Sequence, residues 1–289
     1  MSTFLMRRFI KVNRILAALS LIGSNTLFFS TLSFSSDFQS PRTAALGGAG
    51  HAGPVLNDAI YLNPAFTAFL KSYGLAVNYI RALRPAPHPH YNLSVLDGRS
   101  ELFQAGVGYT RREHNNFIHI GAAKSFVQRI GVGLGAKFGT FQDGTPLAKD
   151  MTASLTLIPI AWVQAALVVD NVLSEDVGKR LGWEREFILG TKVNLMKLVL
   201  LYVDPHWAPE FDKGAWGLEA GVELALFSDF FLRGGLFREA HVPFMNGRGS
   251  GYGFGAGWMA PRLAVDYAFS KAAAGVVGTS HAFGLTVYF

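Results

Sequence analysis

The stretch Phe283-Gly-Leu-Thr-Val-Tyr-Phe289 decides the fold, because large and small side chains alternate along it. One parity carries Phe, Leu, Val and Phe, and the other carries Gly, Thr and Tyr. Successive side chains of a β-strand point to opposite faces. The stretch therefore predicts a strand with one apolar face and one face of small or polar residues.

The same alternation recurs upstream, most clearly in residues 130–138, 216–226 and 263–269. Bacterial single-chain membrane barrels have an even number of strands. A count of twelve stays open, because residues 197–204 and 229–238 alternate poorly. Counting all such segments predicts fourteen strands, at 73–82, 90–97, 101–111, 116–125, 129–141, 150–158, 161–171, 185–194, 197–204, 215–227, 229–238, 250–259, 261–270 and 280–289.

The connections between these segments alternate in length. Those after even-numbered strands are short, for example Pro159-Ile160, whereas several after odd-numbered strands are longer and polar. Outer-membrane barrels have short periplasmic turns and longer outside loops. We therefore predict an all-β, antiparallel transmembrane β-barrel over residues 73–289. A soluble β-sandwich or lipocalin-like barrel is the alternative, but it would carry charge on its outer face.

The composition of the 289 residues agrees with a membrane barrel. The chain is 50% hydrophobic but only 16% charged, against about 25% charged residues in soluble domains. Beyond residue 35 there is no run of 18 apolar residues, so a transmembrane helix is excluded there. Aromatic residues near predicted strand ends fit the interfacial belts of membrane proteins; they include Trp162, Trp183, Trp207, Trp216 and Trp258.

Residues 1–35 are typical of a cleaved secretory signal peptide, with four basic residues before an apolar run. An N-terminal membrane anchor is the alternative. The signal peptide predicts export, and the barrel predicts the outer membrane of a Gram-negative-type bacterium. Cleavage of the signal peptide removes 4 of the 26 Lys and Arg residues and none of the 20 acidic residues, so the net charge falls from +6 to about +2. The remaining charge gives no support for nucleic-acid binding.

Charged residues on the small and polar parity are expected to face the lumen. They would form a charge network that fills the barrel, line a solute path, or do both. Phe231 and Phe237 share parity with Arg233 and would suit an amphipathic ligand, unless a bulge changes their parity. The predicted lumen charge network consists of Arg129, Lys137, Glu219, Glu223, Arg262 and Asp266.

The sequence carries no motif of an enzyme. None of the 8 His residues lies in a nucleophile elbow or a metalloprotease motif. His88-Pro-His90 is a weak metal-binding pattern in an expected outside loop, and Cys is absent. We expect no catalytic residues, no cofactor and no metal site.

The chain before the first strand contains three short motifs: Gly47-Gly-Ala-Gly50, Asn57-Asp-Ala59 and Asn63-Pro-Ala65. Together with the C-terminal segment 280–289, they resemble the FadL/TodX-type outer-membrane family. The resemblance covers about 25 residues at each end, and its closest match in size is the small PorV-type members. Outside loops of this length are too short to form the substrate-catching cap of the large fatty acid transporters.

This resemblance implies that residues 36–72, called the hatch segment below, form a plug inside the barrel with a kink at Asn63-Pro64. It implies either passive transport of hydrophobic molecules such as long-chain fatty acids, gated by the hatch segment, or a non-transporting scaffold in secretion or envelope organisation. The implied hatch and substrate-path candidates are Gly47, Gly48, Asn57, Asp58, Asn63, Pro64, Phe231, Arg233 and Phe237.

The expected partners follow from the same reading. They are outer-membrane lipid, a hydrophobic small molecule, and the outer-membrane assembly machinery, which would read the last strand ending in Phe289. We expect a monomer.

Overall fold

The computed structural model describes residues 38–84, 88–112, 115–141, 147–180, 182–210, 214–227, 229–242 and 247–289. The predicted signal peptide, residues 1–35, lies outside the described residues. No helix in the described ranges is both long enough and apolar enough to cross a membrane.

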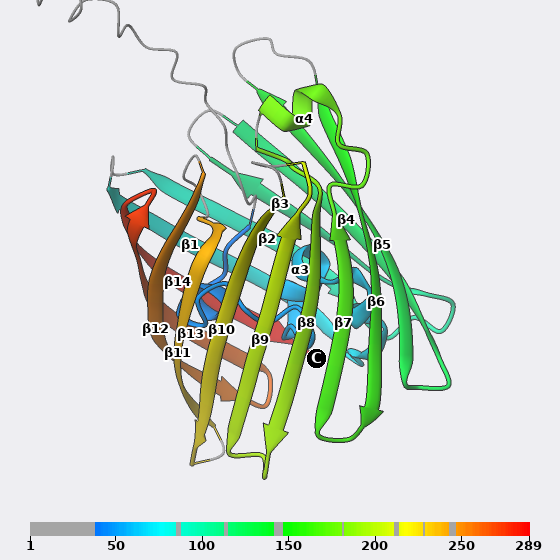
Figure 1. Ribbon diagram of the computed structural model, residues 1–289. Coiled ribbons are helices and arrows are strands. Elements are labelled where there is room, and N and C mark those ends of the chain that lie inside the picture. The colour runs from blue at the N-terminus through cyan, green and yellow to red at the C-terminus, as the bar shows by residue number, and fades with distance from the viewer. Residues whose placement is uncertain are drawn as a thin grey trace, which may run out of the picture. The chain divides into compact units, whose positions relative to one another are not determined.

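Fourteen antiparallel strands form a closed ring in sequence order, and β1 pairs with β14 (Figure 1). The predicted all-β, fourteen-stranded antiparallel barrel is confirmed, and the count of twelve is wrong. The strands are β1 (Tyr73–Arg84), β2 (Pro89–Asp97), β3 (Gln104–Arg111), β4 (Asn115–Phe126), β5 (Ile130–Phe141), β6 (Ala148–Ile160), β7 (Val163–Asp170), β8 (Glu186–Leu195), β9 (Val199–Ala208), β10 (Ala215–Leu226), β11 (Phe230–His241), β12 (Arg248–Ala260), β13 (Leu263–Gly275) and β14 (Gly278–Tyr288).

The alternation read from the sequence separates the two faces of the wall. In β2, Tyr91, Leu93 and Val95 are exposed on the outside. Their neighbours Asn92 and Ser94 are buried inside the ring. Because every strand pairs on both sides, the sheet leaves no open edge.

Strand β9 extends four residues beyond the predicted end at 204. Pro205 was expected to begin a loop, because proline cannot donate to a β-ladder. It pairs with Leu218 of β10, but the β8–β9 ladder has no pair at Pro205 or at Asp204. The sheet thus tolerates Pro205 by interrupting the ladder on one side.

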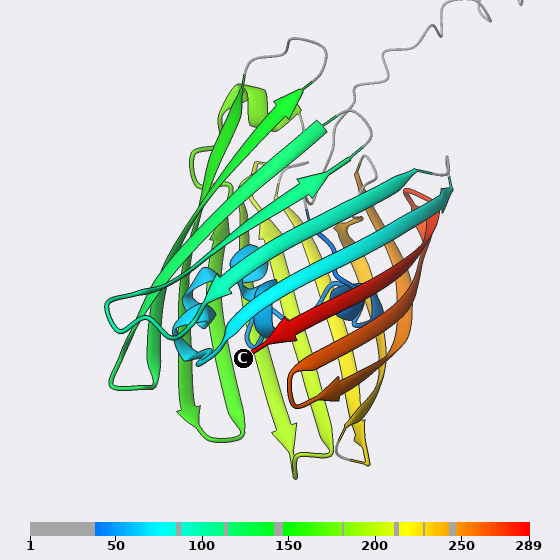
Figure 2. The same ribbon diagram turned by 180° about the vertical axis from the view of Figure 1, so that it is seen from behind.

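The described part of the hatch segment lies inside the ring, where Figure 2 shows it in blue behind β14 and β1. It contains α2 (Pro41–Ala45), η1 (Leu56–Asp58), α3 (Ala59–Leu62) and η2 (Pro64–Phe69). Ser40 caps α2 through a reciprocal hydrogen-bond pair with Thr43. Among the described residues there is one further helix, α4 (Asp176–Arg180), in the β7–β8 connection.

Inward-facing glycines let the hatch segment approach the wall. A Cβ atom at Gly133 would overlap the backbone of Pro64 and Ala65, and one at Gly253 would overlap the carbonyl of Ala44. Glycine is used where another backbone must come this close. The glycine-rich parity of the strands therefore forms the docking surface for the hatch segment.

Candidate functional site: the hatch segment and the lumen wall

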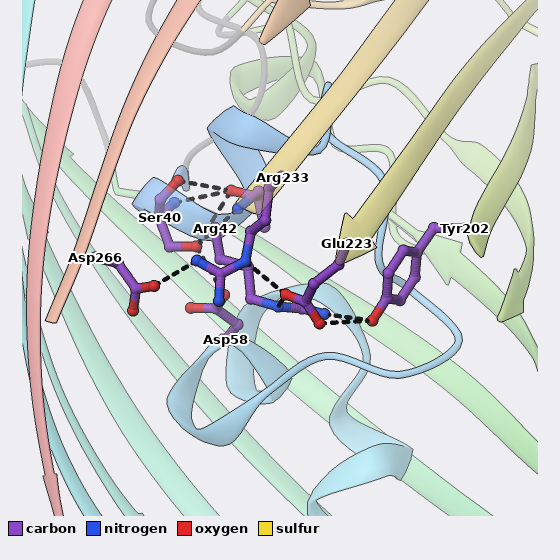
Figure 3. Close-up of polar contacts among 8 residues, drawn as sticks. Ser40, Arg42, Asp58, Tyr202, Glu223, Arg233 and Asp266 are labelled. Atoms are coloured by element: carbon purple, nitrogen blue, oxygen red, sulfur yellow. Dashed lines mark hydrogen bonds and ion pairs between the residues drawn. The ribbon is translucent and has the colours of Figure 1, made fainter. Parts of the chain in front are cut away.

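Arg42 connects the hatch segment to the wall (Figure 3). Its Nε donates to Oε2 of Glu223 on β10 at 3.2 Å, and one of its terminal nitrogens donates to the hydroxyl of Tyr202 on β9 at 2.6 Å. All three residues are buried. A buried guanidinium is stabilised only when it is paired and hydrogen-bonded, so these contacts hold α2 at this place in the lumen.

Arg233 on β11 extends the same network along the wall. It donates to Oε2 of Glu223 at 2.5 Å and also contacts the carboxylate of Asp266 on β13. Figure 3 shows the resulting chain from Tyr202 through Glu223 and Arg233 to Asp266. Residues of α2 and of the four strands β9, β10, β11 and β13 therefore share one polar network.

Asp58 lies beside this network and accepts a hydrogen bond from the Ser40 hydroxyl at 2.7 Å. Burial raises the pKa of Asp58 to about 6, against the opposing effects of Ser40 and Arg42. Its carboxylate is therefore held in surroundings that favour the neutral form.

Asp204 on β9 forms a second anchor. Its Oδ2 accepts from the backbone N–H groups of Gly50 and His51 at 2.7 and 2.9 Å, and lies 2.9 Å from Nδ1 of His51. Its Oδ1 accepts from the N–H of Thr191 on β8 at 3.3 Å, close to where Pro205 interrupts the ladder. The Asp204 carboxylate thus accepts hydrogen bonds from a strand amide, Thr191 N–H, and from the hatch backbone at Gly50 and His51.

Two asparagines make further anchors. Asn57 donates to the carbonyl and hydroxyl of Ser94 at 2.9 and 3.0 Å. Asn63 donates to the carbonyl of His51 at 2.7 Å and to the hydroxyl of Thr156 at 2.8 Å. The backbone changes from α3 to η2 at Asn63, which is extended (φ −158°), as a residue before proline prefers.

A cavity of about 130 Å³ lies between the hatch segment and the connections that follow odd-numbered strands. Its apolar lining includes Phe38, Trp183 and Phe237, and its polar lining includes His51 and Lys137. A smaller cavity of about 30 Å³ lies beside Ser40 and Asp58, near the end of the ring where β14 finishes. The hatch segment separates the two.

The other predicted site residues belong either to the hatch segment or to the barrel wall. Gly47 and Gly48, both with positive φ, lie against Leu236 and the Glu219 carboxylate, while Pro64 packs over Gly121 and Gly135. The following residues also face the lumen: Phe231, which lies beside the Arg233 guanidinium; Phe237, which is buried; and Lys137, which pairs with Asp170 at 3.0 Å.

Two members of the predicted lumen charge network are placed elsewhere. Arg129 and Arg262 are exposed in the β4–β5 and β12–β13 turns, and Arg129 donates to the carbonyl of Pro159. The strands that follow them begin one residue later, at Ile130 and Leu263, so neither arginine is part of a strand with a lumen-facing position. Trp183, expected in an interfacial belt, is buried against Phe117 in the β7–β8 connection.

The sequence reading missed Arg42, Tyr202, Asp204 and His206. His206 was missed because Pro205 before it indicated a loop, and Asp204 because residues 197–204 alternate poorly. Arg42 stands in a segment with no periodicity, so nothing local indicated its partner. An arginine inside an otherwise small and apolar plug was the available signal, since such a charge needs an acidic partner.

Comparison with known proteins gives matches in structure alone. No family model matches the chain, and no curated protein matches it by sequence. The CymD monoaromatic hydrocarbon channel matches with a TM-score of 0.67 at 12% identity, over 89% of this chain and 99% of that one.

Two further structures match over similar lengths. The toluene transporter TbuX of Ralstonia pickettii has a TM-score of 0.61 at 11% identity, over 91% of this chain and 100% of that one. A FadL homologue of Pseudomonas aeruginosa has a TM-score of 0.60 at 12% identity, over 89% and 99% of the two chains. The chain therefore has the fold of the FadL/TodX-type fourteen-stranded barrels.

Proposed function

We propose that this protein is an outer-membrane channel for hydrophobic molecules, gated by its hatch segment. The observation that carries the proposal is the division between the two faces of the wall. Outside, aliphatic side chains such as Leu75, Val77, Leu93 and Val95 are exposed on adjacent strands. An apolar surface of this extent is costly in water and is stable against lipid hydrocarbon.

Aromatic residues support the membrane position. Trp162, Trp207, Trp216 and Trp258 are exposed, and Tyr73 stands at the start of β1. Amphipathic rings prefer the membrane–water interface. The Gram-negative outer membrane is the proposed location, reached through the signal peptide and through assembly machinery that reads the strand ending in Phe289.

The cavity would suit a small molecule with an apolar part. Its volume is about 130 Å³, and its lining combines rings such as Phe38 and Trp183 with polar groups such as Lys137. The stacked rings of Phe38 and Tyr61, whose centroids are 3.8 Å apart, border it on the hatch side. A monoaromatic compound or one end of a fatty acyl chain would fit, and the hatch segment would have to move before the molecule could pass.

Uptake by whole cells tests this proposal. Radiolabelled toluene and a labelled long-chain fatty acid are supplied to a strain that lacks the gene, and to the same strain complemented with it. Faster uptake of at least one compound in the complemented strain is expected. Equal uptake of both, with the protein verified in the outer membrane, would contradict transport.

A non-transporting scaffold, as in the PorV-type proteins, is the second candidate. It is favoured by the ion pairs that join Arg42 to the wall, because they hold the lumen closed. In that case uptake would be equal and other envelope proteins would be recovered with this one after cross-linking in cells. A cross-linked product at the mass of the single chain, 31.4 kDa before processing, would instead agree with a monomer.

A further inference from the structure

Three buried side chains from distant parts of the chain meet beside the cavity: His51 of the hatch segment, His206 of β9 and Glu219 of β10. One ligating atom from each lies within 4.8 Å of the other two. The two imidazole rings meet edge to face, with centroids 5.5 Å apart. Two imidazole nitrogens and a carboxylate are a donor set that binds Zn²⁺ and neighbouring divalent transition metals.

Each imidazole also has a carboxylate behind it. Nδ1 of His51 lies 2.9 Å from Asp204, so Nε2 of that ring is the nitrogen left for a ligand. In His206, Nδ1 lies 3.4 Å from Glu186, and Nε2 lies 3.1 Å from Glu219. A metal-binding histidine usually donates its second nitrogen to a carboxylate or carbonyl, which fixes the ring.

The polar atoms of the cluster lie within ion-pair distance of one another but lack hydrogen-bond geometry. The two nitrogens of His206 and Oε2 of Glu219 are buried, but none of them makes a contact with hydrogen-bond geometry. Buried polar atoms are normally hydrogen-bonded. The arrangement suits a ligand that accepts lone pairs from both residues.

The local charge and the available space favour a dication. Asp204, Glu186 and Glu219 contribute three negative charges, and Arg248, which donates to Glu186 at 2.6 Å, contributes one positive charge. With both imidazoles neutral, as metal ligands must be, the sum is −2; with His206 protonated it is −1. Gly48 has no Cβ atom, which leaves room for the Glu219 carboxylate. His51, His206 and Glu219 all line the cavity, so an ion can reach them through it.

We propose that His51, His206 and Glu219 bind one divalent transition-metal ion, of which Zn²⁺ is the best match to the donor set. Ligand atoms about 2.0–2.2 Å from a tetrahedral Zn²⁺ lie roughly 3.4 Å apart. Small side-chain rotations that move the ligand atoms by about 1 Å would therefore complete the site. His51 belongs to the hatch segment and the other two ligands to the wall. A bound ion therefore fastens the hatch segment to β9 and β10, whether or not the barrel transports anything.

Calorimetry on the whole protein tests the site. The chain is purified in detergent micelles without a polyhistidine tag, treated with EDTA, dialysed and titrated with ZnCl₂. One equivalent per chain is expected, and His206→Gln or Glu219→Gln lowers the affinity at least about 100-fold. Asp204→Asn, which removes only the support of His51, lowers it about 10- to 100-fold. The matched control replaces both His88, just before β2, and His90, within β2, by Ala and keeps the tight equivalent.

A second measurement needs no variant. Cu²⁺ added to the metal-free wild type gives an electron-spin-echo spectrum with two coupled imidazoles, and added Zn²⁺ raises the unfolding temperature of the wild type. Absence of a tight equivalent in the wild type would overturn the proposal and leave His206 as a protonated ion-pair partner of the two glutamates. Loss of binding in the His88 and His90 control would also overturn it, by assigning the ion to the start of β2.

Discussion

Arg42 and Glu223 are 181 residues apart in the chain, yet Nε of Arg42 lies 3.2 Å from Oε2 of Glu223 and both side chains are buried. This ion pair is the charged link between α2 and the barrel wall. Its loss leaves Glu223 with Arg233 but releases the hatch segment at this point.

Arg42→Met is therefore expected to weaken hatch docking by about 3 kcal/mol, because removing one partner of a buried ion pair is strongly destabilising. Protease cleavage within the hatch segment and current noise in planar bilayers both increase. Arg129→Met is the matched control, since Arg129 is exposed in a turn. The double variant Arg42→Met/Glu223→Gln should lose less than the sum of its single variants; strict additivity would mean that the pair does not couple.

Gly235 and Gly234 are adjacent on β11, but their replacement by alanine should affect stability very differently. A methyl group at Gly235 would overlap the backbone of Leu46 and Gly47, whereas one at Gly234 meets nothing within 4 Å. Gly235→Ala is expected to destabilise the docked hatch segment by about 1–3 kcal/mol, and Gly234→Ala to change little. Thermal unfolding in detergent, followed by gel mobility, measures both. Equal midpoints would show that the hatch segment does not press on β11.

The pKa of Asp58 predicts how hatch docking varies with pH. Its folded pKa, about 6, is above the ordinary value of 3.8 because of burial, and the charges facing it are Arg42, Arg233 and Asp266. A raised acid pKa means that the docked state binds the proton more tightly. Docking is thus strongest below about pH 4 and weakens as the pH rises through about 6.

Protease protection of the hatch segment between about pH 4 and about pH 7 measures this effect. Asp58→Asn should remove this part of the pH dependence, and Asp229→Asn, which changes an exposed turn residue, should retain it. Identical pH profiles for the wild type and Asp58→Asn would contradict the assignment.

Deletion of residues 40–66 is expected to open the barrel without preventing its insertion. The ladder between β1 and β14 closes the ring through residue pairs that start at Gly74, and none of these residues belongs to the hatch segment. Conductance in planar bilayers should therefore rise above that of the full chain. If the deleted protein inserts and folds but its conductance is unchanged, the segment is not a plug.

Much of the barrel could be read from the sequence. Period-2 alternation is a local property, so segments such as 130–141 and 280–289 reveal their faces without knowledge of their neighbours. The apolar parity predicted the outward face and the glycine parity the inward one. Strand ends were less accurate: an error of one residue placed Arg129 and Arg262 in the lumen instead of in turns.

Only the tertiary structure decided which residues meet across the lumen. Arg42 with Glu223, Gly50 with Asp204, and Asn63 with Thr156 are pairs brought together by closure of the ring and by the path of a segment without periodicity. His206 could not be predicted as a strand residue, because Pro205 before it lacks a ladder donor and so indicates a loop. Only the pairing of Pro205 with Leu218 of β10 shows that the strand continues. Alternation along each strand, a local property, was enough to predict the barrel wall. The position of the hatch segment inside it depends on contacts between residues far apart in the chain, which the sequence alone does not show.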